Sequence, residues 1–152
     1  MAKHALIPGT FDPFTIGHLE LVRVACALFD EVTVCILLNP EKKHLFNESE
    51  RLAMIREAVK SFDNVHVDCD HGYTADYAAK IGADYIVRGI RNETDAKYEL
   101  PMADFNRERT GVQTIFIPSP AELADVSSTR VREALNKGES ADELLPQPTS
   151  AT

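Results

Sequence analysis

The sequence has few cysteines, and their spacing suits neither a cross-link nor a metal site. Cys26, Cys35 and Cys69 are odd in number, widely separated and embedded in or next to apolar segments. A disulfide framework and a zinc site both need paired or clustered cysteines. We therefore interpret the three thiols as small buried hydrophobic side chains.

Long apolar runs are also missing. No apolar stretch approaches the roughly 20 residues that cross a bilayer. The first residues lack the charged, apolar and small-residue order of a signal peptide. The sequence therefore predicts no membrane contact, and a cytoplasmic location is the simplest expectation.

Positive charge is scarce. The 152 residues include 16 Lys and Arg against 24 Asp and Glu, which gives a formal net charge of −8. Proteins that bind nucleic acid usually gather net positive charge, so we expect no nucleic-acid partner. A small anionic ligand needs only a few local cations. The sequence holds three basic clusters, which are Lys42-Lys43, Arg88 with Arg91, and Arg130 with Arg132.

The most informative stretch is Pro8–Leu19, which reads Pro-Gly-Thr-Phe-Asp-Pro-Phe-Thr-Ile-Gly-His-Leu. It joins a short apolar run to a segment in which Leu19, Val22 and Cys26 recur at helical spacing. A strand, a glycine-bearing loop and a helix start let the backbone approach a phosphate and present free N–H groups to it. His18 falls in the first helical turn, where it can donate a hydrogen bond to charge on a phosphoryl oxygen.

Strand and helix patterns alternate along the rest of the chain. We expect strands at Glu31–Leu38, Val65–Asp68, Tyr85–Val87 and Thr114–Ile117, and helices after Asn47, over Thr74–Ile81, over Thr94–Arg109 and after Ser127. This alternation favours a single α/β domain with a doubly wound, Rossmann-like sheet of five parallel strands and helices on both faces. Ligands bind such sheets at the carboxyl ends of the strands, where the basic loops of this chain fall.

Two further expectations concern the limits of these elements. Pro101 lies inside the fourth helical pattern, so we expect that helix to be disturbed between Ala96 and Met102. The domain is predicted to cover residues 1–138. Residues 139–152 are predicted to form a tail, with a short helix followed by disorder, because the end is rich in Pro, Ser and Thr.

Later segments can also bind anions. Arg88 and Arg91, separated by a glycine and an apolar residue at a strand end, can direct two guanidinium groups into one crevice. The run Ser127–Thr129 puts three hydroxyl groups at a helix start, which makes a second anion site. Lys42 follows the second strand, and two interpretations stay open for it, a phosphate ligand or a solvated charge.

The spacing Gly-Thr-Phe-Asp-Pro-x-Thr-x-Gly-His, followed later by Arg-Gly-x-Arg, resembles phosphopantetheine adenylyltransferase of the nucleotidyltransferase superfamily. The resemblance covers residues 3–137. It implies an enzyme of coenzyme A biosynthesis that transfers the adenylyl group of ATP to 4′-phosphopantetheine, giving dephospho-coenzyme A and pyrophosphate. It also implies Mg²⁺ assistance and a homo-hexamer, and it implies no protein ligand for the metal, which the ATP phosphates carry.

The resemblance implies roles for individual residues. The catalytic residues that it indicates are His18, Lys42 and Arg91. Those that it indicates for ATP are Gly9, Thr10, Phe11, His18, Gly89, Arg91, Glu99, Ser127, Ser128 and Thr129, with Glu99 at the nucleoside end. Those that it indicates for the acceptor are Thr10, Lys42, Thr74, Arg88, Met102 and Asn106, with Lys42 and Arg88 on the phosphate.

The chain departs from the family pattern at Ile16, Ala96, Pro101 and Leu123–Val126. These departures leave open an adenylyltransferase with a different phosphate acceptor, such as a mononucleotide. Thr15 argues against the mononucleotide and cytidylyl enzymes, in which a histidine is expected at that position. A non-catalytic nucleotide-binding sensor is the alternative from another class, and a pyrophosphate-release assay separates it from an enzyme.

Overall fold

The computed structural model of the chain describes residues 2–37 and 43–147. Its strands are β1 (His4–Gly9), β2 (Glu31–Leu37), β3 (Val65–Asp70), β4 (Tyr85–Ile90) and β5 (Gln113–Pro118). Its helices are α1 (Ile16–Leu28), α2 (Glu48–Val59), α3 (Thr74–Ile81), α4 (Glu93–Thr110) and α5 (Ser128–Asn136), with short 3-10 turns η1 (Ala121–Leu123) and η2 (Asp142–Leu144). All strand pairs are parallel, in the order β3-β2-β1-β4-β5, which confirms the predicted doubly wound α/β fold.

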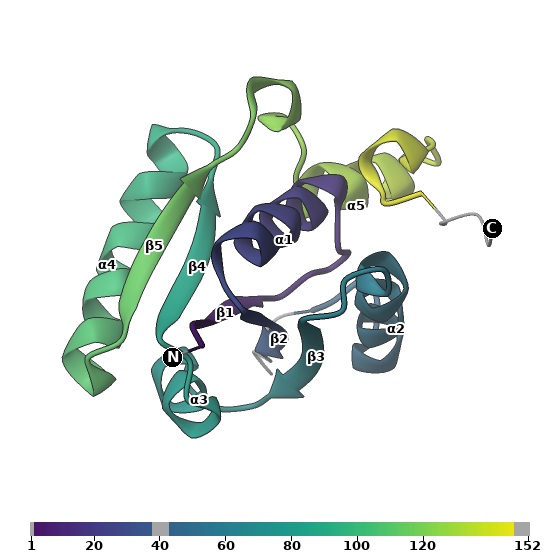
Figure 1. Cartoon of the computed structure of the whole chain (residues 1–152). Helices are drawn as coiled ribbons and strands as arrows, with labels where there is room; N and C mark the ends of the chain where they lie inside the picture. The colour runs from purple at the N-terminus through teal and green to yellow at the C-terminus, as the bar shows by residue number, and fades with distance from the viewer. Residues whose placement is uncertain (1, 38–42, 148–152) are drawn as a thin grey trace.

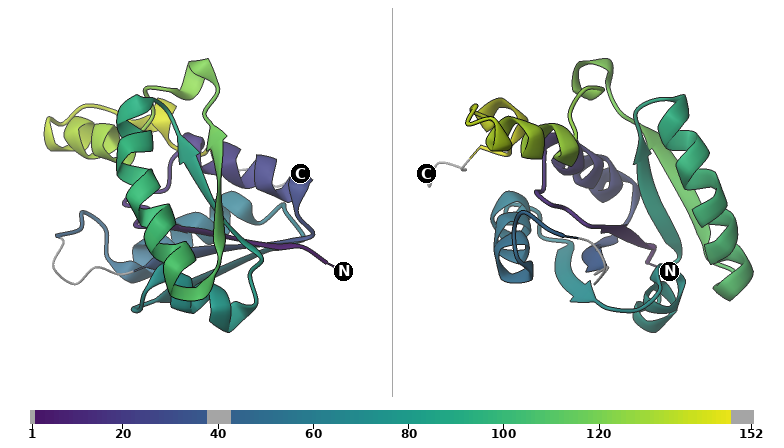
Figure 2. Two further views of the ribbon diagram at one scale, coloured as in Figure 1. Left: turned by 90° about the vertical axis from the view of Figure 1, so that its left-hand side faces the viewer. Right: turned by 180° about the vertical axis from the view of Figure 1, so that it is seen from behind.

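Helices cover both faces of the sheet because successive strand residues point to opposite sides. Ala5 and Ile7 of β1 pack with residues of α1 and α2, whereas Leu6 packs with Tyr77 of α3. Figure 1 shows α1 and α4 on opposite sides of β4 and β5, and Figure 2 shows the same layers from two further sides. The central strands β1 and β2 are therefore buried on both faces, as their continuous apolar runs predict.

The sheet opens between β1 and β4. The chain proceeds from β1 outward to β2 and β3, and then crosses back to β4 and β5 on the other side of β1. β1 pairs with β2 at six positions, but it pairs with β4 only at Ala5–Tyr85 and Leu6–Ile86. The carboxyl ends of β1 and β4 therefore separate, and a crevice forms at this switch in strand order.

Most predicted element limits are confirmed to within a few residues. Asn47 and Glu50 form the capping box at the start of α2, with Asn47 Oδ1 accepting from the Glu50 N–H at 2.8 Å. Gly82 ends α3 with a φ of 71°, a left-handed conformation that glycine adopts without strain. The clearest difference is β4, which continues to Ile90, so Arg88 lies within the strand and not after it.

The expectation that Pro101 disturbs its helix is wrong, because α4 runs from Glu93 to Thr110 without a break. A proline removes the N–H that would bond the carbonyl four residues earlier, here that of Lys97. Pro101 and Lys97 both lie on the exposed side of α4, where water can solvate that carbonyl. Asn92 and Gly111 also cap the two ends of the helix.

Part of the predicted tail belongs to the packed structure. Ala141 and Leu144 are buried against Val126 and Val131, so η2 covers the side of α5. Residues 148–152 lie outside the described residues, and the expected disorder there stays a prediction. Within the ranges that the structure describes, no helix combines the length and apolarity that a bilayer crossing needs.

We predict that Leu144→Ala lowers the free energy of unfolding by about 2 kcal/mol, because it leaves a cavity beside Val126 and Val131. Leu135→Ala is the matched control, since Leu135 is 40% exposed on α5. The control should change the free energy by less than about 1 kcal/mol. Urea denaturation of the three proteins measures both values, and equal losses would show that the tail does not stabilise the domain.

Candidate active site

An open cleft of about 660 Å³ occupies the crevice between β1 and β4. Its walls come from the loop after β1, the start of α1, the end of β4, one side of α4 and the start of α5. All predicted site residues among the described ones line it, namely Gly9, Thr10, Phe11, His18, Thr74, Arg88, Gly89, Arg91, Glu99, Met102, Asn106, Ser127, Ser128 and Thr129. Lys42, the remaining predicted residue, lies outside the described residues.

The end of β1 needs glycine at position 9 because the ring of Phe11 lies directly on it. A Cβ added to Gly9 would come within 2.8 Å of Phe11 Cζ, which is closer than any normal contact. Phe11 itself has a φ of 50°, a conformation that is uncommon for a bulky residue. Phe11 and Phe14 are both buried, and together they form the apolar floor beneath His18.

His18 is held in one orientation and one tautomer. The Thr15 backbone N–H donates to His18 Nδ1 at 2.9 Å, while the Thr15 hydroxyl accepts from the His18 backbone N–H. Because Nδ1 accepts a hydrogen bond, the ring proton of neutral His18 lies on Nε2. The rings of Phe11 and Phe14 lie 4.9 and 5.4 Å from the imidazole. Thr15 therefore caps α1 and also orients the histidine.

The imidazole of His18 is neutral over the whole physiological range. Burial, and to a smaller extent the positive charges of Arg88 and Arg91, together lower its pKa to about 3. A neutral ring with its proton on Nε2 can donate a hydrogen bond to an anion. It carries no charge with which to form an ion pair.

Two arginines of the cleft are fixed by carboxylates from one helix. Arg88 donates from Nε and a terminal nitrogen to Glu99 at 2.9 and 2.6 Å, and its other terminal nitrogen donates to the Pro8 carbonyl at 2.5 Å. Arg91 donates to Asp95 from its backbone N–H, Nε and a terminal nitrogen, at 2.9 to 3.1 Å. Asp95 and Glu99 are one turn apart, so one side of α4 holds both guanidinium planes.

These ion pairs have two consequences for the predicted roles. Hydrogen bonds from Arg91 hold the pKa of Asp95 below its usual value, so this carboxylate stays charged. Glu99, expected at the nucleoside end, contacts Arg88 on the expected acceptor side of the cleft. A contact between Glu99 and the nucleoside stays a prediction.

The start of α5 forms the opposite wall. Ser127 caps the helix by accepting from the Arg130 N–H, Ser128 donates to the Pro13 carbonyl at 2.7 Å, and Thr129 accepts from Arg132. The Ser128 hydroxyl therefore donates within the protein, whereas those of Ser127 and Thr129 accept and can still donate their own protons. An anion at this helix start can be bound by these two hydroxyls, by backbone N–H groups and by the helix dipole.

Sequence reasoning missed several residues that line the cleft. Asp95 is the most informative, and its position four residues before Glu99 on a predicted helix was the signal available. His44 was also missed, whereas Lys43 and Arg132, which line the cleft too, belong to basic clusters that the sequence indicated. Their places depend on contacts between distant parts of the chain.

Two of the departures from the family pattern meet in space. Ile16 and Leu123 both pack against the apolar cluster of Val126 and Val131 at the start of α5. Both therefore contribute aliphatic packing behind the helix start. The other two, Ala96 and Pro101, lie on α4.

The chain matches known proteins over nearly its whole length. Residues 6–134 match the family described as cytidylyltransferase-like. The phosphopantetheine adenylyltransferase of Kocuria rhizophila is 42% identical over 145 residues, which cover 95% of this chain and 93% of the relative. That of Corynebacterium diphtheriae is 41% identical over 150 residues, which cover 98% and 94%.

Solved structures share the fold at low sequence identity. A bifunctional NMN adenylyltransferase/ADP ribose pyrophosphatase of Francisella tularensis is 17% identical with a TM-score of 0.70, over 97% of this chain and 46% of that longer one. A lipopolysaccharide core biosynthesis protein of Thermoplasma volcanium is 23% identical with a TM-score of 0.59, over 79% of this chain and 99% of that one. These likenesses show the fold alone.

The low pKa of His18 predicts an acid sensitivity that can be measured. His18 becomes protonated near pH 6.5 in the unfolded chain but only near pH 3 in the folded chain. The free energy of unfolding therefore falls as the pH decreases from 6.5 toward 3. Between pH 6.5 and 4.5 this contribution should reach up to about 2 kcal/mol. It should disappear in His18→Gln.

Denaturation curves at several pH values test this expectation. The difference in unfolding free energy between wild type and His18→Gln should shrink toward pH 4.5. His71→Gln removes an exposed histidine and serves as the control, whose curve should run parallel to that of wild type. Parallel curves for His18→Gln as well would contradict a neutral, buried His18.

Proposed function

The chain belongs to the phosphopantetheine adenylyltransferase family of cytidylyltransferase-like proteins, and on this basis we propose that it adenylylates 4′-phosphopantetheine. ATP is the donor, and dephospho-coenzyme A and pyrophosphate are the products, in a step of coenzyme A synthesis. The observation that carries this proposal is one cleft that combines a neutral histidine donor, two held arginines and a helix start. That cleft lies in a chain about as long as relatives with this activity in their names.

The reaction needs no nucleophile from the protein. The phosphate of the acceptor is already an anion, and one of its oxygens attacks the α-phosphorus of ATP. A new P–O bond forms to that phosphorus while its bond to the bridging oxygen of the β-phosphate breaks and pyrophosphate leaves. The protein therefore has to align the two substrates and offset the charge that builds on the α-phosphate.

His18 is suited to the α-phosphate. Its proton on Nε2 can be donated as a hydrogen bond to a non-bridging oxygen, because Thr15 occupies Nδ1. The ring lies on the apolar floor of Phe11 and Phe14, where a hydrogen bond to developing charge is stronger than in water. Because His18 is neutral, it stabilises this charge without a proton transfer.

The positions of the arginines support separate roles on the two sides of the cleft. Arg91 reaches the Val126 carbonyl, directly before the α5 start, so we assign Arg91 and Ser127–Thr129 to the outer phosphates of ATP. Arg88 contacts the Pro8 carbonyl at the end of β1, and we assign it, with Lys42, to the acceptor phosphate. Thr10 lies in the loop between these sides and would contact both substrates.

The remaining predicted residues suit the arm of the acceptor. Thr74 begins α3, while Met102 and Asn106 lie one turn apart on α4, and all three line the same cleft. Together they offer apolar surface and hydrogen-bonding groups to a flexible chain that contains amides. Glu99 would act here by holding Arg88, in addition to any contact with the nucleotide.

The proposal also includes Mg²⁺ assistance, a homo-hexamer and a cytoplasmic location. Asp95 and Glu99 are engaged by arginines, so the phosphates of ATP would supply most ligands to the metal. Tyr98 and Phe105 on α4 are 75% and 47% exposed, which favours association between copies. The location follows only from the family.

The first test compares acceptors while pyrophosphate release is followed with ATP and Mg²⁺. We expect 4′-phosphopantetheine to exceed nicotinamide mononucleotide, flavin mononucleotide and a sugar phosphate in kcat/KM by at least about a hundredfold. Pantetheine without its phosphate should be inert, because it lacks the nucleophile and the group that Arg88 binds. Preference for a mononucleotide would reassign the acceptor. Binding of ATP without release from any acceptor would favour a sensor.

The second test removes the histidine donor. His18→Ala should lower kcat by at least about a hundredfold, the usual effect of losing a preorganised donor to transition-state charge. His71→Ala should leave turnover unchanged. A His18→Ala protein that melts normally and turns over at a near-normal rate would show that His18 is structural.

A further inference from the structure

Arg51 and Asp12 are the two most deeply buried charged side chains among the described residues, each only 2% exposed. Arg51 is on the first turn of α2, and Asp12 is in the loop after β1. Burial of a charge is unfavourable unless hydrogen bonds compensate for the lost water, so the partners of these groups indicate their role.

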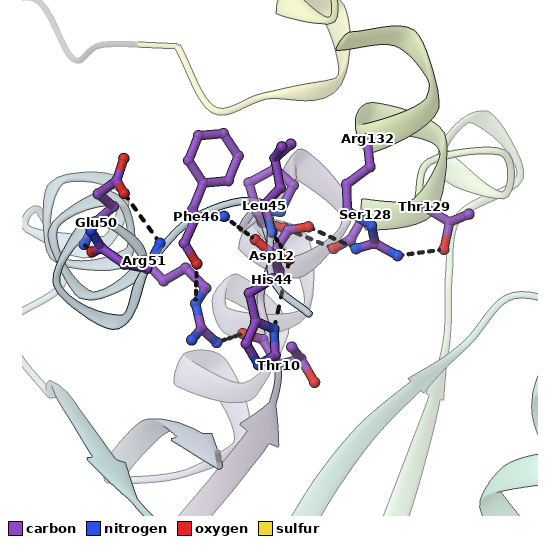
Figure 3. Close-up of polar contacts among 12 residues, drawn as sticks. Thr10, Asp12, His44, Leu45, Phe46, Glu50, Arg51, Ser128, Thr129 and Arg132 are labelled. Atoms are coloured by element: carbon purple, nitrogen blue, oxygen red, sulfur yellow. Dashed lines mark hydrogen bonds and ion pairs between the residues drawn. The ribbon is translucent and has the colours of Figure 1, made fainter. Parts of the chain in front are cut away.

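The two side chains connect the same pair of loops from opposite sides. Arg51 donates from a terminal nitrogen to the Thr10 carbonyl at 2.9 Å and from Nε to the Phe46 carbonyl at 3.1 Å. The Asp12 carboxylate accepts from the backbone N–H groups of Leu45 and Phe46 at 2.8 and 2.9 Å. Figure 3 shows that Phe46 is bonded through its N–H to Asp12 and through its carbonyl to Arg51.

The loops joined in this way carry groups that line the cleft. Thr10 lies on the first loop, and Lys43 and His44 lie on the second, just before the bonded residues. His44 Nδ1 is 3.8 Å from the Asp12 carboxylate. The two loops follow different strands, β1 and β2. The four hydrogen bonds of Arg51 and Asp12 fix the position of one loop relative to the other.

The ATP side is attached to the same loop by separate contacts. Arg132 donates to the Asp12 carbonyl, and Ser128 donates to the Pro13 carbonyl, both at 2.7 Å. These bonds use backbone oxygens of the first loop and not the Asp12 carboxylate. Loss of Arg51 therefore leaves the attachment of α5 in place.

We propose that Arg51 is a positioning residue of the adenylyl transfer, which holds the Lys43–Phe46 loop against the Thr10 loop so that acceptor phosphate and ATP meet in line. Asp12 completes the same clamp. This inference rests on the proposed function. The side chains of Arg51 and Asp12 bind backbone groups of the two loops, and both would act on the substrates through the position of these loops.

To connect the two loops, a side chain at position 51 needs two hydrogen-bond donors in a fixed, divergent geometry. The planar guanidinium reaches Thr10 and Phe46 at once, whereas a lysine ammonium is a single centre on a flexible stem. Arg51→Lys should therefore keep the charge and lose one of the two bonds. Arg51→Met keeps much of the length and loses both.

Kinetics and binding of these variants test the inference. For Arg51→Met we expect at least a tenfold lower kcat and a tenfold higher KM for 4′-phosphopantetheine, with the ATP dissociation constant by calorimetry within about threefold of wild type. The kcat and acceptor KM of Arg51→Lys should lie between those of wild type and Arg51→Met. Arg56→Met removes an exposed arginine from the same helix and should match wild type.

Hydrogen exchange gives a readout that does not depend on activity. The amides of Leu45 and Phe46 should exchange at least tenfold faster in Arg51→Met, while those of residues 131–136 in α5 keep their protection. Asp12→Asn, which cannot accept from both amides, should show the same loop effect if Arg51→Met does not fold. If the wild-type protein is inactive, the proposed function is overturned. The exchange test then still shows whether Arg51 and Asp12 hold the two loops together.

A folded Arg51→Met with wild-type acceptor KM, kcat and loop exchange would overturn the inference. Equal losses of ATP and acceptor binding would do so as well, because they indicate general loosening of the fold. A variant that only melts at a lower temperature, with normal kinetics at 15 °C, would show that Arg51 is structural.

Discussion

The site depends on the early separation of β1 from β4. Because these neighbouring strands pair at only two positions, the backbone around Pro8 and Gly9 is free to face a ligand instead of a partner strand. Arg88 bridges the gap by donating to the Pro8 carbonyl, which ties β4 to the end of β1 across the opening. Every other part of the cleft is arranged around this opening, with α4 on one side and α5 on the other.

The arginines of the cleft are held in place before a substrate arrives. A protein with a formal charge of −8 would repel a polyphosphate unless its few cations were concentrated at the site. Arg88 and Arg91 provide this concentration, and Glu99 and Asp95 hold their planes without using all their donors. Arg88 donates three of the five N–H groups of its guanidinium to the protein, which leaves two without a partner among the described residues.

The sequence was sufficient for the fold and for residues that line the cleft within the described ranges, and insufficient for the contacts between them. Periodicity predicted all five strands because each is a continuous local pattern. The Gly9–His18 spacing predicted a phosphate loop from local chemistry, and the structure places that loop in the cleft. The pairing of Arg88 with Glu99 joins a strand to a helix, and such a contact produces no repeating pattern in the sequence. Pro101 was misjudged because propensity does not report which side of α4 faces water.

The buried polar contacts suggest that alignment in this cleft is more sensitive to substitution than the fold is. The sheet and its apolar core involve many side chains, so the loss of one contact is shared among neighbours. The position of the Thr10 loop relative to the Phe46 loop depends on two side chains, Arg51 and Asp12. In-line transfer requires aligned reacting atoms, and a misplacement of about 1 Å can lower the rate about a hundredfold, so a small shift of one loop lowers the rate strongly. Substitutions behind the loops would thus reduce activity at temperatures where the domain is still folded.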